Sequence, residues 1–285
     1  MQNQMSRTTS LKIARFVITA VLLCVTIIVM IPLYYLLLGS FTDTARLFAD
    51  GLALYPRWEI MGFFNYVKTV VERDGVYWNW YLNSITITAM YTVGALFLTS
   101  LVGYGLGVYH FRGKNFLFVL VLVVMMIPIE ILMLPLFSMA VQWGFLNTRL
   151  GVILPFLVAG NAVFFFRQFC SGLPLEMMDA GRIDGATEFG IYYHIMVPLM
   201  KPAFGAMTIL LAMAGWNMFL WPMIVLRGNA NLTLPVGLAT LLSPYGDNWA
   251  FLLPGAVLAV IPVIIVFLFN QKSFVSGLAS GGVKG

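Results

Sequence analysis

The sequence is poor in charged residues, cysteine and histidine. Only 9% of its 285 residues are charged and 61% are hydrophobic, whereas about a quarter of the residues of a soluble domain are charged. Its two cysteines and two histidines lack metal-ligand spacing, which argues against a metal site or a disulfide framework. The sequence also lacks a Gly-x-x-x-x-Gly-Lys-Ser/Thr phosphate loop, so the chain cannot power itself. These absences predict a membrane protein that is not an enzyme.

Long apolar runs indicate an all-α, polytopic membrane protein. A hydrocarbon core about 30 Å thick needs roughly 20 apolar residues per helix. Backbone N–H and C=O groups inside a bilayer must form hydrogen bonds with one another, as they do in helices and closed β-barrels. The alternating pattern of a β-barrel is absent from the sequence. We therefore expect one transmembrane domain over residues 1–285, with six transmembrane helices. The helices are expected at about residues 16–38, 83–108, 116–137, 151–169, 202–226 and 250–269.

Lysine and arginine concentrate in alternate connections. They precede the first run, lie between runs two and three and between runs four and five, and follow the sixth. The opposite short connections carry only Arg149 and Arg227. Since positively charged loops stay inside, both termini and the loop between runs four and five are predicted to be cytoplasmic. The net charge of +5 is explained by this topology and by contact with anionic lipid, not by nucleic-acid binding.

Two external segments have distinct compositions. Residues 41–82 mix charges with aromatic rings, which predicts a short amphipathic segment at the outer interface with no chemistry of its own. Residues 243–248, Ser-Pro-Tyr-Gly-Asp-Asn, are turn formers and predict a protruding tip that contains Tyr245, Asp247 and Asn248. A plain connecting turn is the alternative interpretation of this tip.

The cytoplasmic loop at about residues 170–201 is longer and more polar than a connection requires. A helix that begins near Pro174 would bring Met177, Ala180, Gly181 and Asp184 onto one face at three- and four-residue spacing. Small residues on such a face suit a groove on another protein. The alternative is an amphipathic helix on the inner leaflet, but such helices are usually basic. This one carries acidic residues around the same face, Glu176 and Asp179.

Local signals predict how this helix ends and the next begins. Gly185 permits a left-handed backbone angle and a sharp turn. Thr187 is suited to cap a second helix, which we expect at about residues 188–196. This second helix is expected to end before Pro198.

A few polar or aromatic residues within the apolar runs are candidates for the translocation path. Glu130 is the only carboxylate well inside a run, and a buried carboxylate must be paired, hydrated or protonated. Trp216, Asn217 and Trp221 offer rings and an amide that suit sugars. Packing between helices is the alternative role for all four residues.

Several stretches together resemble the carbohydrate permeases of ATP-binding-cassette (ABC) importers, in particular the second permease of maltose-type systems. Asp179-Ala180-Gly181 stands where that family has Glu-Ala-Ala, a substitution that weakens the helix slightly. The other matching stretches are Arg182-Ile183-Asp184-Gly185-Ala186, Val197-Pro198-Leu199-Met200-Lys201-Pro202, Trp216-Asn217-Met218-Phe219-Leu220-Trp221-Pro222, Met126-Ile127-Pro128 with Pro135, and the tail at 274–285.

The resemblance implies a type I importer permease fold in a bacterial cytoplasmic membrane. It implies a heterodimer with a second permease, two ATPase subunits that bind ATP and Mg²⁺, and an external solute-binding protein, with no cofactor in this chain. The ATPase-coupling residues would be Glu176, Asp179, Ala180, Gly181, Asp184, Gly185 and Ala186. Within the cytoplasmic tail at 271–285, Gly281, Gly282 and Lys284 would contact the ATPases, while Tyr245, Asp247 and Asn248 would meet the binding protein.

The function implied is ATP-driven import of a carbohydrate or a related solute. A self-sufficient secondary transporter or channel is the alternative. Such a protein would normally show inverted repeats with interrupted helices or several intramembrane charges, and here Glu130 is alone.

Overall fold

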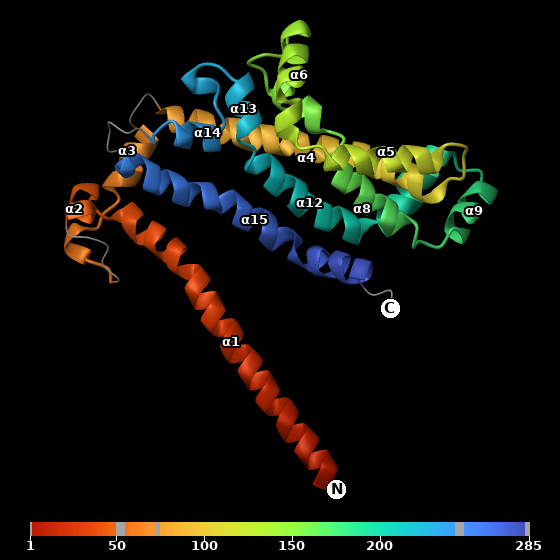
Figure 1. Cartoon of the computed structure of the whole chain (residues 1–285), viewed down its shortest axis with the longest axis horizontal. Coiled ribbons are helices and arrows are strands. Elements are labelled where there is room, and N and C mark those ends of the chain that lie inside the picture. Colours follow the sequence, from red (N-terminus) through yellow and green to blue (C-terminus); the bar gives the residue numbers. More distant parts are fainter. Residues whose placement is uncertain (1, 50–54, 72–74, 243–247, 283–285) are drawn as a thin grey trace. The chain divides into compact units, whose positions relative to one another are not determined.

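The computed structural model describes residues 2–49, 55–71, 75–242 and 248–282. Every regular element within these ranges is a helix, and an isolated bridge pairs Thr42 with Met61. Backbone contacts divide the chain into two compact units, residues 1–74 with 241–258 and residues 75–240 with 259–285. Figure 1 shows the helices in sequence colours.

Four helices in the described residues are long and apolar enough to cross a membrane, and the number rises to six if each of two bent pairs is one span. The four are Lys12–Phe41, Val76–Val108, Lys201–Val225 and Trp249–Lys272. The bent pairs are Lys114–Met126 with Ile129–Gln142 and Arg149–Phe156 with Gly160–Cys170. All six predicted runs therefore correspond to helical segments, although two of them change direction.

The first unit contains α1 (Gln2–Phe41), α2 (Thr44–Ala49), the 3-10 turn η1 (Trp58–Ile60) and α3 (Phe64–Val71). The start of α15 (Trp249–Gly282) also belongs to it. The buried Asn65 amide on α3 donates to the backbone oxygens of Ser40 and Thr42, at 3.1 and 2.8 Å. These bonds satisfy carbonyl groups at the end of α1, where the helix itself provides no further donors.

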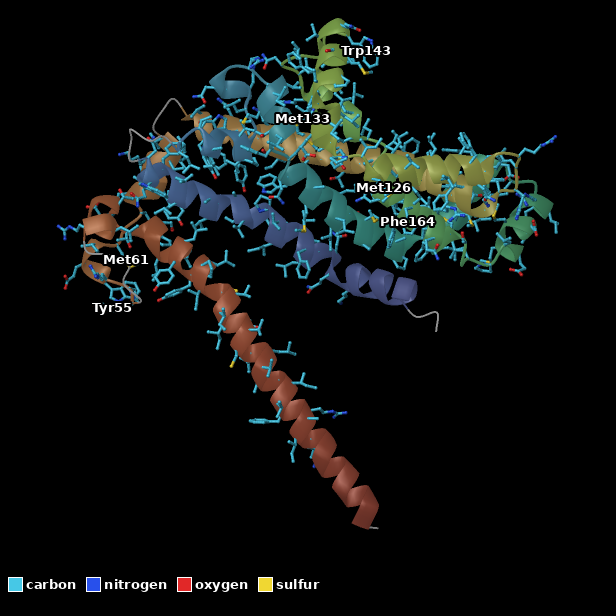
Figure 2. The ribbon with its side chains drawn as sticks, viewed as in Figure 1. Tyr55, Met61, Met126, Met133, Trp143 and Phe164 are labelled. Atoms are coloured by element: carbon cyan, nitrogen blue, oxygen red, sulfur yellow. The ribbon has the colours of Figure 1, made fainter. Side chains whose placement is uncertain are left out.

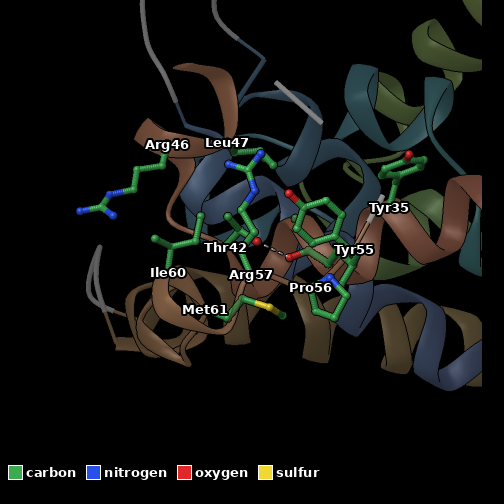
Figure 3. A pocket seen from close by; sticks show the side chains of 11 residues that line it. Tyr35, Thr42, Arg46, Leu47, Tyr55, Pro56, Arg57, Ile60 and Met61 are labelled. Atoms are coloured by element: carbon green, nitrogen blue, oxygen red, sulfur yellow. Dashed lines mark hydrogen bonds between the residues drawn. The ribbon is translucent and has the colours of Figure 1, made fainter. Parts of the chain in front are cut away.

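A small cavity in the first unit lies between the end of α1 and η1 (Figure 3). The guanidinium of Arg57 lies over the ring of Tyr55, 6.0 Å from its centroid. The volume of the cavity, about 30 Å³, is that of about one water molecule. It is therefore too small to hold a sugar.

The second unit is organised around α4 (Val76–Val108), which packs against α8 (Gly160–Cys170) and α12 (Lys201–Trp216). Gly103 and Gly107 allow α8 to approach α4 closely. A Cβ atom at position 103 would lie 2.5 Å from the Cβ of Phe166 and 2.9 Å from the backbone nitrogen of Arg167. Small residues at four-residue spacing are a common way for membrane helices to pack backbone to backbone.

The remaining elements of this unit lie around that core. They are α5 (Lys114–Met126), α6 (Ile129–Gln142), α7 (Arg149–Ile153), η3 (Leu154–Phe156), α9 (Glu176–Ile183), α10 (Glu188–Ile191), the π-helical turn η4 (Tyr192–Met196), α11 (Val197–Leu199), α13 (Leu220–Val225), η5 (Asn229–Asn231), α14 (Leu234–Ala239) and the rest of α15.

The second span begins earlier than the sequence indicates. Helix α4 starts at Val76 rather than at Asn83, so Tyr77 and Trp80 belong to it and are buried. The indole of Trp80 donates to the carbonyl of Asn229 at 2.6 Å. Trp80 therefore packs against η5 and α14, an interaction between distant segments that the sequence does not indicate.

Two of the predicted runs are not straight. The third bends by 100° between α5 and α6, at Ile127 and Pro128, and the fourth bends by 47° between η3 and α8. Met126 at the end of α5 and Trp143 just after α6 are both exposed in this chain (Figure 2). At the other end of the chain, α15 continues through the predicted tail as far as Gly282.

Candidate functional site

The loop predicted to be cytoplasmic forms a helix that presents an acidic and apolar surface. Helix α9 spans Glu176–Ile183, and its acidic residues lie in the first turn, where they complement the helix dipole. Four of its exposed residues, together with the neighbouring Leu175 and Asp184, form one surface, which we call the coupling surface, while the exposed Asp179 and Arg182 pair with each other. The coupling surface consists of Leu175, Glu176, Met177, Ala180, Ile183 and Asp184.

Gly181 lies on the opposite face of α9. Both Met178 and Gly181 are buried in the second unit. A Cβ at position 181 would lie 2.7 Å from Cδ1 of Ile195 and 3.1 Å from Cγ1 of Ile191. The prediction that Gly181 shares an outward face with Met177, Ala180 and Asp184 is therefore wrong. Its lack of a side chain instead lets α9 lie close to the helix that follows.

The predicted turn and cap are confirmed. Gly185 has a φ of 78°, the left-handed angle that glycine adopts without strain. The Thr187 hydroxyl caps α10 by accepting a hydrogen bond from the amide of Gly190 at 3.1 Å. The predicted helix end before Pro198 is wrong. The π-helical turn η4 holds one more residue than an α-helical turn, and α11 then continues the helix through Pro198.

An ionic cluster joins α9 to α10 and to the end of α4. The guanidinium of Arg182 donates to Asp179 at 2.9 Å and to both carboxylate oxygens of Glu188, at 2.9 and 3.3 Å. Glu188 also accepts a hydrogen bond from the hydroxyl of Tyr109, the residue that follows α4. Hydrogen bonds from Arg182 and then from Tyr109 lower the pKa of Glu188. Burial, followed by the bond to Glu188, raises the pKa of Tyr109, so the phenol remains a donor.

The cluster should make the stability of the loop depend on acid pH. Because the pKa of Glu188 is lowered from its ordinary value of 4.5, its contribution is complete above that pH and is lost as pH falls through the lowered value. We expect local opening of residues 176–191, measured by hydrogen exchange corrected for the intrinsic rate, to increase as pH falls through the acid range, and to depend less on pH in Glu188→Gln. An equal pH dependence in both proteins would contradict this role.

Two apolar side chains of the loop are more exposed than the sequence reasoning anticipated. Ile183 is 86% exposed at the end of α9 and Phe189 is 60% exposed on α10. Neither was a candidate for coupling. An isoleucine and a phenylalanine in an otherwise polar cytoplasmic loop were a signal available in the sequence, because large exposed apolar groups mark interaction surfaces.

The two tryptophans of the predicted translocation path pack inside the second unit. The indole of Trp216 donates to the carbonyl of Ala259 at 3.1 Å, and that of Trp221 donates to the carbonyl of Gly151 at 3.0 Å. Both side chains are buried. Trp216 also lines a cavity of about 40 Å³. The indole N–H groups of both residues are thus bonded within the fold, as the packing interpretation expects.

The other two path candidates are exposed but are not brought together with the tryptophans. Asn217 lies in the break between α12 and α13, and its amide donates to the carbonyl of Met213 at 2.9 Å. Glu130 is exposed in the first turn of α6, just after the bend. The open grooves beside α6 are lined mainly by apolar residues, including Leu136, Met139, Met133 and Phe137.

The candidates at the ends of the molecule are only partly described. Asn248 precedes α15, and its amide donates to the carbonyl of Leu241 at 3.2 Å. Tyr245 and Asp247 lie outside the described residues, as does Lys284. Gly281 and Gly282 form the end of α15.

Comparison with known proteins gives the same fold and identifies the family. A solved structure of a bacterial ABC transporter involved in the import of the acidic polysaccharide alginate matches with a TM-score of 0.80 and 25% identity, over 90% of this chain and 95% of that one. The chain thus has the type I fold of an ABC importer permease and is a multi-pass membrane protein. Residues 99–277 match the family described as "Binding-protein-dependent transport system inner membrane component". The chain belongs to this family.

Two curated relatives illustrate the range within the family. The arabinooligosaccharides transport system permease protein AraQ of Bacillus subtilis (strain 168) is 49% identical, over 95% of this chain and 96% of the relative. The lactose transport system permease protein LacG of Rhizobium radiobacter is 32% identical, over 89% of this chain and 90% of the relative. Membership in an ABC import family sets aside the alternative of a self-sufficient secondary transporter or channel.

Proposed function

We propose that this chain is one of two permease subunits of an ATP-driven importer that carries oligosaccharides across a bacterial cytoplasmic membrane. The observation that carries the proposal is the exposed coupling surface, in which acidic groups surround the 86% exposed side chain of Ile183. An isoleucine side chain that stays in water contributes nothing to the stability of a loop, whereas a groove on a partner would bury it. Two ATPase subunits that bind ATP and Mg²⁺ are the partners of this surface.

The remaining partners follow from the same assembly. A second permease would complete the pathway, with Glu130 and Asn217 as the exposed polar groups that this chain contributes to the path or to the interface between permeases. A solute-binding protein would meet the external tip at 243–248, and the end of α15 would reach the ATPases. Closure of the ATPases would push on α9 and tilt the spans as rigid bodies. The whole chain would act as a single transmembrane domain, with both termini in the cytoplasm.

The solute class is inferred from the relatives. Two permeases named for arabinooligosaccharides are 49% identical to this chain, whereas permeases named for glycerol 3-phosphate are 28% identical. The apolar runs also lack a cluster of lysine or arginine that would suit a strongly anionic solute. A neutral oligosaccharide rich in hydroxyl groups is therefore the favoured cargo.

Uptake by a reconstituted complex tests this function. The chain should be assembled in proteoliposomes with its partner permease, two ATPase subunits and a receptor, and supplied with radiolabelled arabinotriose. We expect uptake to require ATP and every partner. Excess unlabelled lactose or glycerol 3-phosphate should reduce this uptake only weakly. Uptake by this subunit alone, driven by an ion gradient, would contradict the importer. ATP-dependent uptake of glycerol 3-phosphate in preference to arabinotriose would contradict only the solute class.

A further inference from the structure

Glu188 sits where three segments of the second unit meet. One side of its carboxylate is held by Arg182 of α9, and Oε2 also accepts the hydrogen bond from Tyr109, 79 residues away in sequence. Glu188 itself is the first residue of α10. A single carboxylate therefore joins the helix that carries the coupling surface to the end of the α4 span.

The contacts continue from Tyr109 along α4. The hydroxyls of Tyr109 and Tyr104 are 3.3 Å apart, and their rings pack edge to face with centroids 5.4 Å apart. The Tyr104 hydroxyl lies 3.8 Å from the sulfur of Met178 on α9. One turn further into the span, the Ser100 hydroxyl is 2.7 Å from that of Tyr192 in η4. The inner end of α4 is thus connected to α9 and η4 at successive turns.

These contacts differ in what they can transmit. Met178 is buried beneath Tyr104, so it resists pushing α9 towards α4 but holds weakly against a pull or a sliding motion. The bonds of Glu188 are directional and charge-assisted, so they resist sliding as well. Because the Arg182 and Glu188 side chains are about half exposed, at 42% and 53%, the pair adds little to global stability. The pair instead fixes the position of α9 relative to the end of α4.

We propose that Glu188 and Tyr109 are positioning residues that make α9 and the inner end of α4 move as one body, so that a sliding or pulling displacement of the coupling surface also reaches the span. This proposal rests on the proposed function, because it assumes that an ATPase binds α9. It concerns residues outside the coupling surface, whose loss would leave the ATPase bound but its stroke poorly transmitted.

Tyr109→Phe and Glu188→Gln test the link with little change in shape. In proteoliposomes that hold the full complex, both variants should retain wild-type amounts of ATPase while arabinotriose delivered per ATP hydrolysed falls about three- to fivefold. Because each change breaks the same connection, the double variant should lose no more than the worse single variant. Tyr193→Phe and Glu59→Gln are matched controls at exposed positions and should be unchanged.

Three results of this experiment would each overturn the proposal. The first is an unchanged ratio of arabinotriose to ATP in both single variants, and the second is a double variant whose loss is the product of the two single losses. Loss of bound ATPase in the single variants would likewise overturn it, since it would assign Glu188 and Tyr109 to docking.

A second measurement does not depend on the solute. Hydrogen exchange of the complex, with and without ADP and vanadate, should change protection at 176–183 and at 100–108 together in the wild type. In the Tyr109→Phe variant, protection should change at 176–183 and stay the same at 100–108. If the wild-type complex takes up no arabinotriose but protection changes in both segments, the proposed solute is wrong and the connection through Glu188 and Tyr109 is still supported. A response at 100–108 that persists in Tyr109→Phe would refute the link.

Discussion

An Ile183→Asp variant is expected to lose its ATPase subunits. The side chain of Ile183 is 86% exposed in this chain, and full burial of an isoleucine contributes about 1.5–3 kcal/mol. A carboxylate at this position forfeits that contribution and must also lose its hydration on binding. Since 1.4 kcal/mol is roughly a factor of ten in affinity, we expect ATPase binding to weaken at least about tenfold. Co-purification from membranes, followed by titration with purified ATPase, measures the loss.

A matched variant separates docking from a general effect of a new charge. Val71→Asp places the same group on α3, in the first unit, at a side chain that is 68% exposed. It should retain its ATPase. If Ile183→Asp also binds the ATPase with wild-type affinity, the coupling surface does not dock there and the proposed function loses its main support.

Gly103→Ala is expected to destabilise the second unit. The added Cβ would meet the Cβ of Phe166 at 2.5 Å and backbone atoms of α8 at 2.9 and 3.0 Å, and the backbone of a helix cannot move aside as a flexible side chain can. Overpacking of this kind typically costs about 1–3 kcal/mol. We expect a lower unfolding temperature in detergent and less protein in the membrane. Both are measurable by scanning fluorimetry and by quantitative immunoblotting.

The same helix offers the control. Gly105 is two residues away on α4, and a Cβ there would find nothing within 4 Å. Gly105→Ala should therefore unfold at or slightly above the wild-type temperature, because alanine favours a helix more than glycine does. Equal destabilisation by both substitutions would mean that flexibility of α4, not its contact with α8, is what the glycines provide.

The sequence is most informative where the determining interactions are short-range. The turn at Gly185 and the cap at Thr187 depend on residues within a few positions, and both are as predicted. The apolar runs likewise identify helices, because the requirement for internal hydrogen bonds acts on each run separately. The family motif adds the type I permease fold, which composition alone does not specify.

Features that depend on distant residues could not be predicted in this way. The bond between Tyr109 and Glu188 joins positions 79 residues apart, and no local pattern marks it. An indole suits a sugar ring and a packed core equally, and the sequence could not show that Trp216 and Trp221 bond to backbone oxygens of distant segments. Gly181 was assigned to the wrong face because helical spacing alone does not say which side a neighbouring helix will cover.

The 100° bend after α5 restricts how this chain can exist in a bilayer by itself. Helix α5 has 13 residues and is about 20 Å long, which is less than the hydrocarbon thickness of about 30 Å. A change of direction at that depth leaves peptide oxygens without helical donors, and acyl chains offer none. The corner at Ile127 and Pro128 must therefore be sheltered by another protein or by water. Without a second protein at this corner, water would have to reach it for the chain to remain in the bilayer.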